Sequence, residues 1–375
     1  MSLPTSARPS AEHPFGDPAA IRCERAASEL RSGRPILIDD GHGARIAVLA
    51  LDGSTQGSYA AFAAATGNAQ QLFLTPPRAR VLGIDAPEGA LVPLDGLSFD
   101  EVTRLGYLRD APTPSAWTPG RTLHVAAVRV ARLGLLLPAM LVADVADDAA
   151  AFEGCGRIAL EDLERGDQAA GRDFELVTRS PVPLRDVGMT QFVVFRGGLA
   201  QRDQVAIIVG SPDTDGVVPV RVHSSCLTGD LFGSLKCDCG DQLRLGLRAL
   251  KAMGGGVLLY LDQEGRGTGI ASKMRAYGYQ HDGLDTIDAD AQLGFGADER
   301  RYETAVAMLR GLGIRRVELL TNNPAKVMHL RSAGVDVVRR TEVAGEVTHE
   351  NEHYLRTKAA RSGHLLDVDA LLARR

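Results

Sequence analysis

Short apolar runs alternate with amphipathic segments throughout the second half of the chain. Residues 205–209 and 257–261 are continuous apolar runs typical of buried strands, and residues 242–253 carry apolar side chains at helical spacing. The predicted elements are strands 205–209, 218–223, 257–261, 317–321 and 335–339 and helices 242–253, 270–280, 299–311 and 325–332. Strands that alternate with helices of this length predict an α/β fold, in which a mixed sheet is covered on both faces in a three-layer αβα domain.

The first half predicts a smaller α+β domain. Residues 19–31 have the apolar spacing of a helix ended by Gly33, and strands 35–38 and 46–51 flank a turn at residues 39–43. The charged segment 161–185 contains Ser180-Pro-Val-Pro183 and is interpreted as a connector, with a domain boundary near residue 165. We therefore expect a disordered lead-in (1–18), an amino-terminal domain (19–165), a catalytic domain (166–345) and a carboxyl-terminal extension (346–375).

Composition and charge narrow the class of protein. The chain has 375 residues and a formal net charge of −5, whereas a general nucleic-acid binder needs a basic face that neutralises phosphates. The longest apolar stretch, residues 133–143, is much shorter than the roughly 20 residues that cross a bilayer. Residues 1–17 lack the apolar core of a secretory signal. We expect a cytoplasmic protein with no nucleic-acid or membrane partner.

Three of the five cysteines, Cys226, Cys237 and Cys239, fall within fourteen residues. In an extended segment, Cys237 and Cys239 would project to the same side, and a turn containing Gly229 could bring Cys226 to them. Three thiolates leave one tetrahedral position open for water, as in a catalytic zinc site. His223 could instead complete a closed structural site, and the spacing does not decide between the two.

Three further segments carry candidate chemistry. The glycine-rich run from Tyr260 to Gly269 lies between a predicted strand and helix, where backbone amides can approach phosphate, but it has neither P-loop nor dinucleotide-binding spacing. Acidic residues in 298–301, at a predicted helix start, are usually partners of the helix dipole. In 319–326, capping explains Asn323 and Pro324 but leaves Thr321 and Lys326 beside a second possible anion site.

Over residues 221–339 these segments together resemble GTP cyclohydrolase II, which catalyses the first step of riboflavin biosynthesis. The motifs are Arg-Val-His-Ser-Ser-Cys226, Lys-Cys-Asp-Cys239, Gln-Glu-Gly-Arg266, Asp-Glu-Arg300 and Thr-Asn-Asn-Pro-Ala-Lys326. The resemblance implies a homodimer that converts GTP to 2,5-diamino-6-ribosylamino-4(3H)-pyrimidinone 5′-phosphate, formate and pyrophosphate, with catalytic Zn²⁺ held by the three cysteines and Mg²⁺ on the triphosphate.

The resemblance also implies roles for individual residues. Asp298 would accept a proton, Arg300 would attack the α-phosphorus, and Tyr277 near the zinc would favour complete ring opening over release of the formamide. The implied GTP-binding residues are Arg221, Val222, His223, Ser224, Ser225, Gln242, Glu264, Gly265, Arg266, Thr286, Thr321 and Lys326.

Two positions depart from the family pattern: Ser225 replaces a glutamate and Asp262 replaces an arginine. Loss of a carboxylate beside a metal commonly costs about 10–100-fold in metal affinity or activity. A zinc enzyme acting on another nucleotide or ring, and a non-catalytic nucleotide-binding relative, therefore stay open as alternatives.

The amino-terminal domain carries a second resemblance. Residues 24–40 are similar to the opening of dihydroxybutanone-phosphate synthase, but Gly41-His-Gly-Ala-Arg45 replaces the acidic metal-binding loop of that family. We expect a degenerate, catalytically silent domain that serves structure or assembly.

Overall fold

The computed structural model describes residues 16–146, 150–170, 174–199, 202–296, 298–300, 302–343, 351–361, 363, 365 and 367–372. Most of the predicted lead-in and 11 of the 30 residues of the predicted carboxyl-terminal extension lie outside these residues. The chain forms two compact units, each discontinuous in sequence. One contains Ala170–Ile270 and Arg300–Arg375, and the other contains Pro9–Ala169 and Ala271–Glu299. The boundaries expected from the sequence stay predictions.

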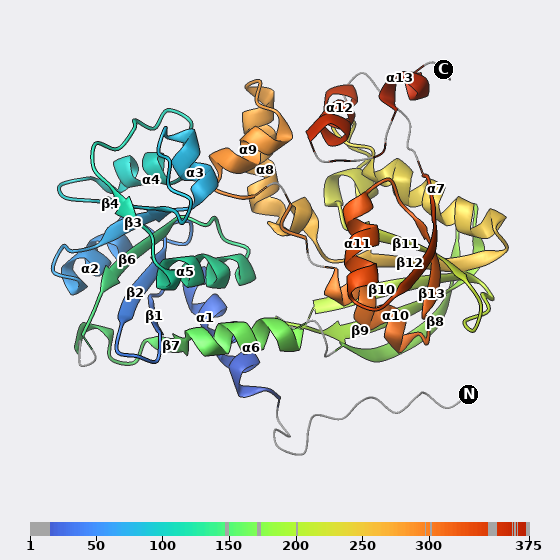
Figure 1. The fold of residues 1–375 in the computed structure, drawn as a ribbon, viewed down its shortest axis with the longest axis horizontal. Helices are drawn as coiled ribbons and strands as arrows, with labels where there is room; N and C mark the ends of the chain where they lie inside the picture. The colour runs from blue at the N-terminus through green and yellow to red at the C-terminus, as the bar shows by residue number, and fades with distance from the viewer. Residues whose placement is uncertain are drawn as a thin grey trace. The chain divides into compact units, whose positions relative to one another are not determined.

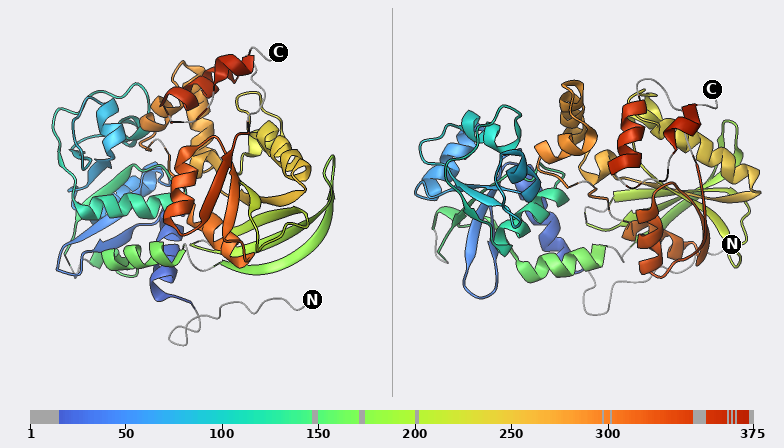
Figure 2. Two further views of the ribbon diagram at one scale, coloured as in Figure 1. Left: turned by 45° about the vertical axis from the view of Figure 1, so that its right-hand side comes forward. Right: turned by 45° about the horizontal axis from the view of Figure 1, so that its top comes forward.

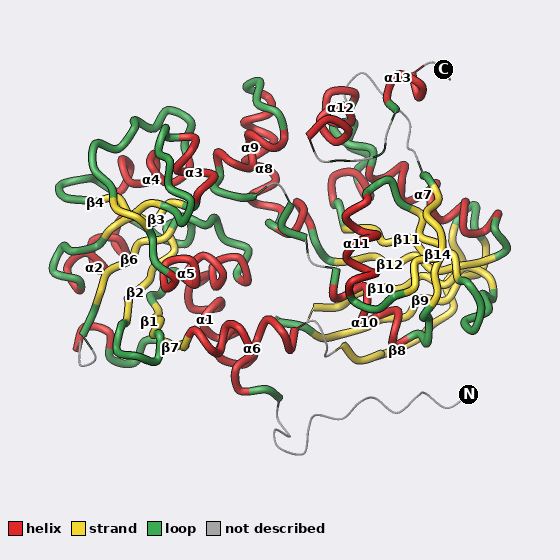
Figure 3. Tube along the Cα trace, viewed as in Figure 1, coloured by secondary structure: helices red, strands yellow, loops and turns green. Residues whose placement is uncertain are grey.

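The unit that contains Cys226, Cys237 and Cys239 is built on a seven-stranded mixed sheet (Figures 1 and 3). Its order is β14-β13-β11-β12-β10-β9-β8. The first four strands of that order run parallel and the last three continue antiparallel. The bounds are β8 (Phe174–Leu184), β9 (Gly188–Gly197), β10 (Arg202–Gly210), β11 (Val218–Ser224), β12 (Gly255–Leu261), β13 (Arg316–Leu320) and β14 (Asp336–Thr341).

Helices cover both faces of this sheet, as the alternation of side chains along β12 requires. Val257, Leu259 and Leu261 pack in one apolar cluster with α10 (Glu303–Gly311) and α11 (Pro324–Ser332). Leu258 packs in a second cluster with α7 (Cys239–Ala252). The prediction of a three-layer αβα domain is confirmed. Shorter elements are η2 (Leu227–Leu231), η3 (Glu264–Gly267), α12 (Glu352–Arg361) and α13 (Val368–Leu372).

Residues 161–185 contain the junction between the two units, between Ala169 and Ala170, but they are not an irregular connector. They form most of α6 (Leu160–Ala170) and the whole of β8. Pro181 and Pro183 suggested a break in regular structure, but β8 is the last strand of the sheet and, among the strands that the structure describes, pairs only with β9. An edge strand tolerates proline because one row of its backbone groups has no partner strand.

The second unit, which Figure 2 shows in two further views, also contains a seven-stranded mixed sheet. Its order is β5-β4-β3-β6-β2-β1-β7, and among its described strands only β1 and β7 pair in parallel. Its strands are β1 (Ile36–Asp39), β2 (Arg45–Ala50), β3 (Gln71–Leu74), β4 (Ala90–Pro93), β5 (Thr118–Pro119), β6 (Met140–Asp144) and β7 (Gly156–Ala159). Its helices before residue 160, within the part of the chain that the structure describes, are α1 (Pro18–Arg31), α2 (Gln56–Ala65), α3 (Pro76–Val81), α4 (Phe99–Tyr107), α5 (Thr122–Leu133) and η1 (Ala150–Phe152). The expected mixture of helices and strands in the amino-terminal domain is confirmed.

Two helices from the second half of the chain belong to this amino-terminal unit. They are α8 (Ile270–His281), from Ala271 onward, and α9 (Thr286–Gln292). Figure 1 shows α9 beside α3, and residues of these two helices are in contact. The apolar pattern of residues 270–280 predicts the helix correctly but not the unit in which it packs.

Among the described residues, no helix combines the length and the apolar character that crossing a membrane requires.

Candidate metal and substrate site

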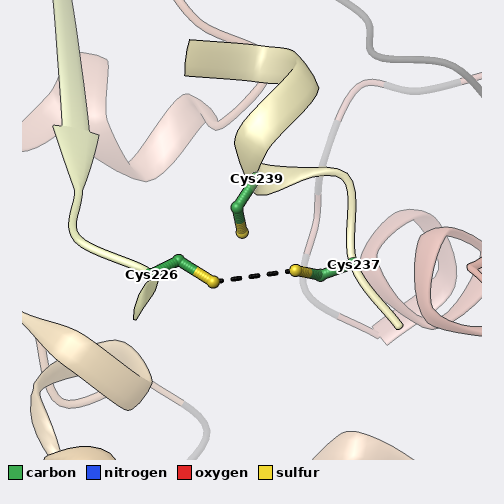
Figure 4. A group of neighbouring side chains, drawn as sticks. All are labelled: Cys226, Cys237 and Cys239. Carbon is green, nitrogen blue, oxygen red and sulfur yellow. Dashed lines mark hydrogen bonds between the residues drawn. The ribbon is translucent and has the colours of Figure 1, made fainter. Parts of the chain in front are cut away.

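The three clustered cysteines converge on one point (Figure 4). Cys226 follows β11, Cys237 lies in the loop before α7, and Cys239 is the first residue of α7. All three sulfurs lie within 4.8 Å of one another, and those of Cys226 and Cys237 are 3.6 Å apart. The expectation that Cys237 and Cys239 share an extended segment is wrong, because Cys239 opens a helix. The turn at the start of α7, rather than strand alternation, directs their sulfurs to the same point.

Gly229 leaves the space in which the sulfurs meet. A Cβ at this position would lie 2.9 Å from Cys237 Sγ, 3.1 Å from Cys226 Sγ and 3.1 Å from Cys239 Cβ. The Gly229 backbone N–H donates to Cys226 Sγ over 3.3 Å. Three sulfur donors around a cradle without side chains fit Zn²⁺, which thiolates bind in preference to hard oxygen-seeking cations.

The protonation state of the cysteines affects how well they can bind a metal ion. The pKa of Cys237 is raised, chiefly by its hydrogen bond with Cys226. A divalent cation would oppose this effect, because a coordinating thiol is deprotonated outright.

His223 does not join the three cysteines. Its Nε2 lies 3.2 Å from the carboxylate of Asp230, and its ring stacks on Tyr260 with centroids 5.6 Å apart. Asp230 also accepts hydrogen bonds from the Tyr260 hydroxyl and from the Cys226 backbone N–H, each over 2.9 Å. Burial lowers the pKa of His223, while burial and the bond to Asp230 raise that of Tyr260. This network therefore fixes the loop that presents Cys226, and it offers no imidazole to complete a closed structural site.

Arg221 is buried beneath α7. It donates to the Leu320 carbonyl over 3.1 Å and to Gln242 Oε1 over 2.7 Å, and Gln242 in turn donates to Asp238. A Cβ at Gly246 would lie 2.4 Å from Arg221 Cδ, so the glycine makes room for the guanidinium. Burial lowers the pKa of Arg221 to about 10, so it stays charged at neutral pH. Arg221 and Gln242 are thus held together by a hydrogen bond near the end of β11.

The two positions that depart from the family pattern are neighbours in the structure. The Ser225 backbone N–H donates to the Leu261 carbonyl over 2.8 Å, and Ser225 Oγ accepts from the Gln263 backbone N–H over 3.2 Å. Ser224 Oγ lies 3.4 Å from Gln263 Oε1. Asp262, between Leu261 and Gln263, pairs with Arg202 over 3.1 Å.

The glycine-rich run turns sharply after β12. Gly265 and Arg266 both have a positive φ, of 61° and 60°. This conformation suits glycine but strains arginine, by about 1–2 kcal/mol. Glu264 accepts a hydrogen bond from the Leu227 backbone N–H over 2.6 Å, which ties this turn to the loop that follows Cys226.

Tyr302 lies between two predicted site residues. The Arg300 guanidinium and Lys326 Nζ each lie 5.8 Å from the centroid of its ring. Lys326 Nζ also donates to the Val222 carbonyl over 2.8 Å, and Thr321 Oγ1 accepts from the Asn323 backbone N–H over 3.1 Å. One signal in the sequence points to Tyr302, which is an aromatic residue directly after a pair of arginines.

The placing of residues 298–301 at a helix start is wrong. Helix α10 begins at Glu303, so Asp298 and Arg300 precede it in irregular backbone, and Arg301 lies outside the described residues. The dipole of α10 therefore does not account for Asp298.

Three predicted residues belong to the amino-terminal unit. Tyr277 is on α8, with Lys273 Nζ 5.5 Å from its ring centroid, and Thr286 is the first residue of α9, which Asp285 caps. Asp298 is exposed in the segment after α9. The structure thus brings the other predicted residues together around β11, β12 and α7 in one unit, and it assigns these three to the other.

Comparisons with known proteins give one family. The family model for GTP cyclohydrolase II matches residues 175–342. The chain is 61% identical to a GTP cyclohydrolase-2 of Xylella fastidiosa, over 99% of this chain and 93% of that protein, and 38% identical to one of Azospirillum brasilense, over 96% and 98%. A solved two-domain 3,4-dihydroxy-2-butanone 4-phosphate synthase from A. baumannii is similar over 86% of this chain and 99% of that chain, at 15% identity and a TM-score of 0.33, a score too low for comparing the folds in detail. The chain belongs to the GTP cyclohydrolase II family.

Proposed function

We propose that this chain is a GTP cyclohydrolase II that hydrolyses GTP to the diaminopyrimidinone ribosylamine 5′-phosphate, formate and pyrophosphate, at the start of riboflavin biosynthesis. The observation that carries the proposal is the cluster of Cys226, Cys237 and Cys239 around Gly229, in a chain 61% identical to a GTP cyclohydrolase-2 over nearly its whole length. The three cysteines would hold Zn²⁺. When bound, Zn²⁺ would supply Lewis-acid activation of water for hydrolysis of the purine ring.

The residues around the cysteines support roles in binding the triphosphate. Lys326 and Arg300 are cations beside the ring of Tyr302, and Arg266 is held in a conformation that costs energy. Strained backbone of this kind is concentrated at ligand sites, where the ligand contact compensates for the strain. Arg221 and Gln242 would hold the end of β11, and with it Val222 to Ser225, in place beside the substrate.

Arg300 and Asp298 would act at the α-phosphorus. A guanidinium nitrogen of Arg300 forms a bond to phosphorus as the bond to the pyrophosphate oxygen breaks, and Asp298 accepts the proton that the guanidinium loses. Water then cleaves the nitrogen–phosphorus bond and leaves a 5′-phosphate. Mg²⁺ would neutralise charge on the departing pyrophosphate.

One experiment tests the proposal directly. Purified protein supplied with Zn²⁺, Mg²⁺ and GTP should release formate and the pyrimidine product, while Cys237→Ser should lose bound zinc and all formate release, because two sulfurs cannot complete the site. Failure of the unmodified protein to release formate from GTP would refute the proposal.

A second candidate, a zinc enzyme that acts on another nucleotide or ring, is favoured by one observation. Position 225 carries a serine that accepts from the backbone of Gln263, in place of the carboxylate usual in the family. A panel of purine nucleoside triphosphates in the same formate assay separates the two, since turnover of another nucleotide but not GTP would favour this candidate. Binding of nucleotides without turnover would instead favour a non-catalytic relative.

Two expectations remain. We infer a homodimer from the family resemblance, which sedimentation can test. We infer a cytoplasmic location from the polar amino-terminal sequence, which fractionation can test.

A further inference from the structure

The segment Ala271–Glu299 carries Tyr277, Thr286 and Asp298, and it packs with the amino-terminal sheet domain as part of one compact unit. That domain has no predicted catalytic role of its own. Its contacts with the segment therefore bear on what the domain does for the reaction.

An apolar cluster forms the centre of the contact. Ala276 of α8, Ala289 of α9 and the following Leu293 and Phe295 are buried together with Leu137 of the amino-terminal domain. At Gly294, φ is +87°, and a Cβ would lie 3.1 Å from both Pro138 Cγ and Thr75 Oγ1. Backbone and side chains are thus closely packed where the segment leaves α9.

Arg78, almost completely buried, joins the segment to α4. Its guanidinium donates to the carbonyls of Arg104, Leu105 and Leu108 at the end of α4, over 2.7–2.9 Å, and to the Gln292 carbonyl of α9 over 3.0 Å. Burial lowers the pKa of Arg78 to about 10, so it remains charged at neutral pH. A cation at a helix carboxyl end is electrostatically favourable, and here the same cation also holds α9.

Polar contacts attach the segment to the amino-terminal domain at points close in sequence to Tyr277 and Asp298. Arg275, two residues before Tyr277, pairs with the buried carboxylate of Asp52 over 2.7 Å, and Asp52 also accepts from the Leu137 backbone N–H over 3.1 Å. Glu299, next to Asp298, pairs with Arg132 over 2.9 Å. The Tyr279 hydroxyl donates to the Tyr107 carbonyl over 2.7 Å.

We propose that the amino-terminal domain is a positioning element of the cyclohydrolase, which holds Tyr277, Thr286 and Asp298 in place through Asp52, Arg78 and the backbone carbonyl of Tyr107. This inference rests on the proposed function. Reacting groups must be held within about 0.5 Å of their productive geometry, and a displacement of 1 Å can cost about 100-fold in rate. A domain without chemistry of its own can therefore govern the rate through these contacts.

Asp52→Asn tests the proposal, with Asp162→Asn as the matched control. Both carboxylates are mostly buried in the same unit, with side chains 9% and 11% exposed, and each pairs with an arginine, at 2.7 and 2.6 Å. Asp162 pairs with Arg22 of α1, and its hydrogen bonds involve none of the described residues in 271–299. A general loss of stability should therefore affect both variants alike.

We expect Asp52→Asn to lower kcat/KM for GTP by about tenfold or more, with zinc content unchanged, and Asp162→Asn to stay within about twofold of the unmodified enzyme. Asp52→Glu, which keeps the carboxylate, should recover part of the loss. Tyr279→Phe removes a single hydroxyl without opening a cavity, and it should also lower kcat/KM relative to the unmodified enzyme. Hydrogen exchange of residues 271–299 should rise in Asp52→Asn and not in Asp162→Asn.

Equal kcat/KM in Asp52→Asn, Tyr279→Phe and Asp162→Asn would overturn the proposal, and so would equal exchange of residues 271–299 in the two aspartate variants. Absence of formate release by the unmodified enzyme is a different result. It would refute the proposed function itself, while the exchange measurement would still report whether the domain holds the segment.

Discussion

Gly229→Ala adds one methyl group at the point where the three cysteine sulfurs meet. The new Cβ would lie 2.9 Å from Cys237 Sγ and 3.1 Å from Cys226 Sγ, whereas ordinary van der Waals contact begins at 3.4 Å. The sulfurs would have to retreat by about 0.3–0.5 Å, which exceeds the roughly 0.2 Å that metal–ligand distances tolerate. The hydrogen bond from the backbone of residue 229 to Cys226 would survive, so the effect should be steric.

We expect zinc affinity to fall at least tenfold, which corresponds to about 1.4 kcal/mol. Competition with a chromophoric chelator measures this affinity, and formate release should fall with zinc occupancy. Gly57→Ala in α2 is the control, because its Cβ would meet only Thr55 Oγ1, at an ordinary 3.7 Å. Unchanged zinc affinity in Gly229→Ala would show that the cysteines do not hold the metal in the arrangement described.

The other predictions concern a nucleophile, a strained residue and an acid-sensitive ion pair. Arg300→Ala should abolish attack on phosphorus, and normal product formation would refute that assignment. Arg266→Gly should leave the melting temperature unchanged or higher, because glycine adopts a positive φ freely, while kcat/KM for GTP falls; unchanged kinetics would exclude a binding role. The hydrogen bond from Arg22 lowers the pKa of Asp162 in the folded state. The stability that this ion pair contributes is therefore fully present above the pKa of an aspartate in the unfolded chain, about 3.9, and it is lost as the pH falls through the lower pKa of the folded state. Asp162→Asn should therefore flatten the fall of melting temperature as the pH drops below about 4, and an unaltered acid profile would contradict this.

The features that the sequence predicted well are those set by local spacing. Apolar runs such as residues 257–261 identify strands because burial on both faces of a sheet requires continuous apolar character, and β12 is indeed buried on both faces. Asn323 and Pro324 place the start of α11 correctly, since the asparagine side chain accepts from the Ala325 backbone N–H. The spacing of the three cysteines predicted that their sulfurs converge, because a shared metal ion is the simplest explanation for three cysteines in so short a stretch.

The features that the sequence did not predict depend on contacts between distant residues. Pro181 and Pro183 suggested a connector, because nothing local reveals that β8 lies at the edge of a sheet. The apolar face of α8 predicts that the helix is buried, but it does not predict which element packs against it. Arg275 pairs with Asp52, which lies more than two hundred residues earlier in the chain. Tyr302 becomes relevant only when Lys326 reaches the same ring as Arg300.

The discontinuity of the two units has a consequence for how the chain is made. The amino-terminal unit needs residues 271–299, which leave the ribosome about a hundred residues after Ala169. At about 5–20 residues per second, that interval lasts roughly 5–20 s. During it, the buried guanidinium of Arg78 lacks its acceptor on Gln292, and Leu137 lacks the apolar partners that will cover it. The nascent amino-terminal domain therefore presents an incomplete surface to chaperones and to neighbouring chains until much of the second half has been translated, and slow codons between residues 170 and 270 would prolong that exposure.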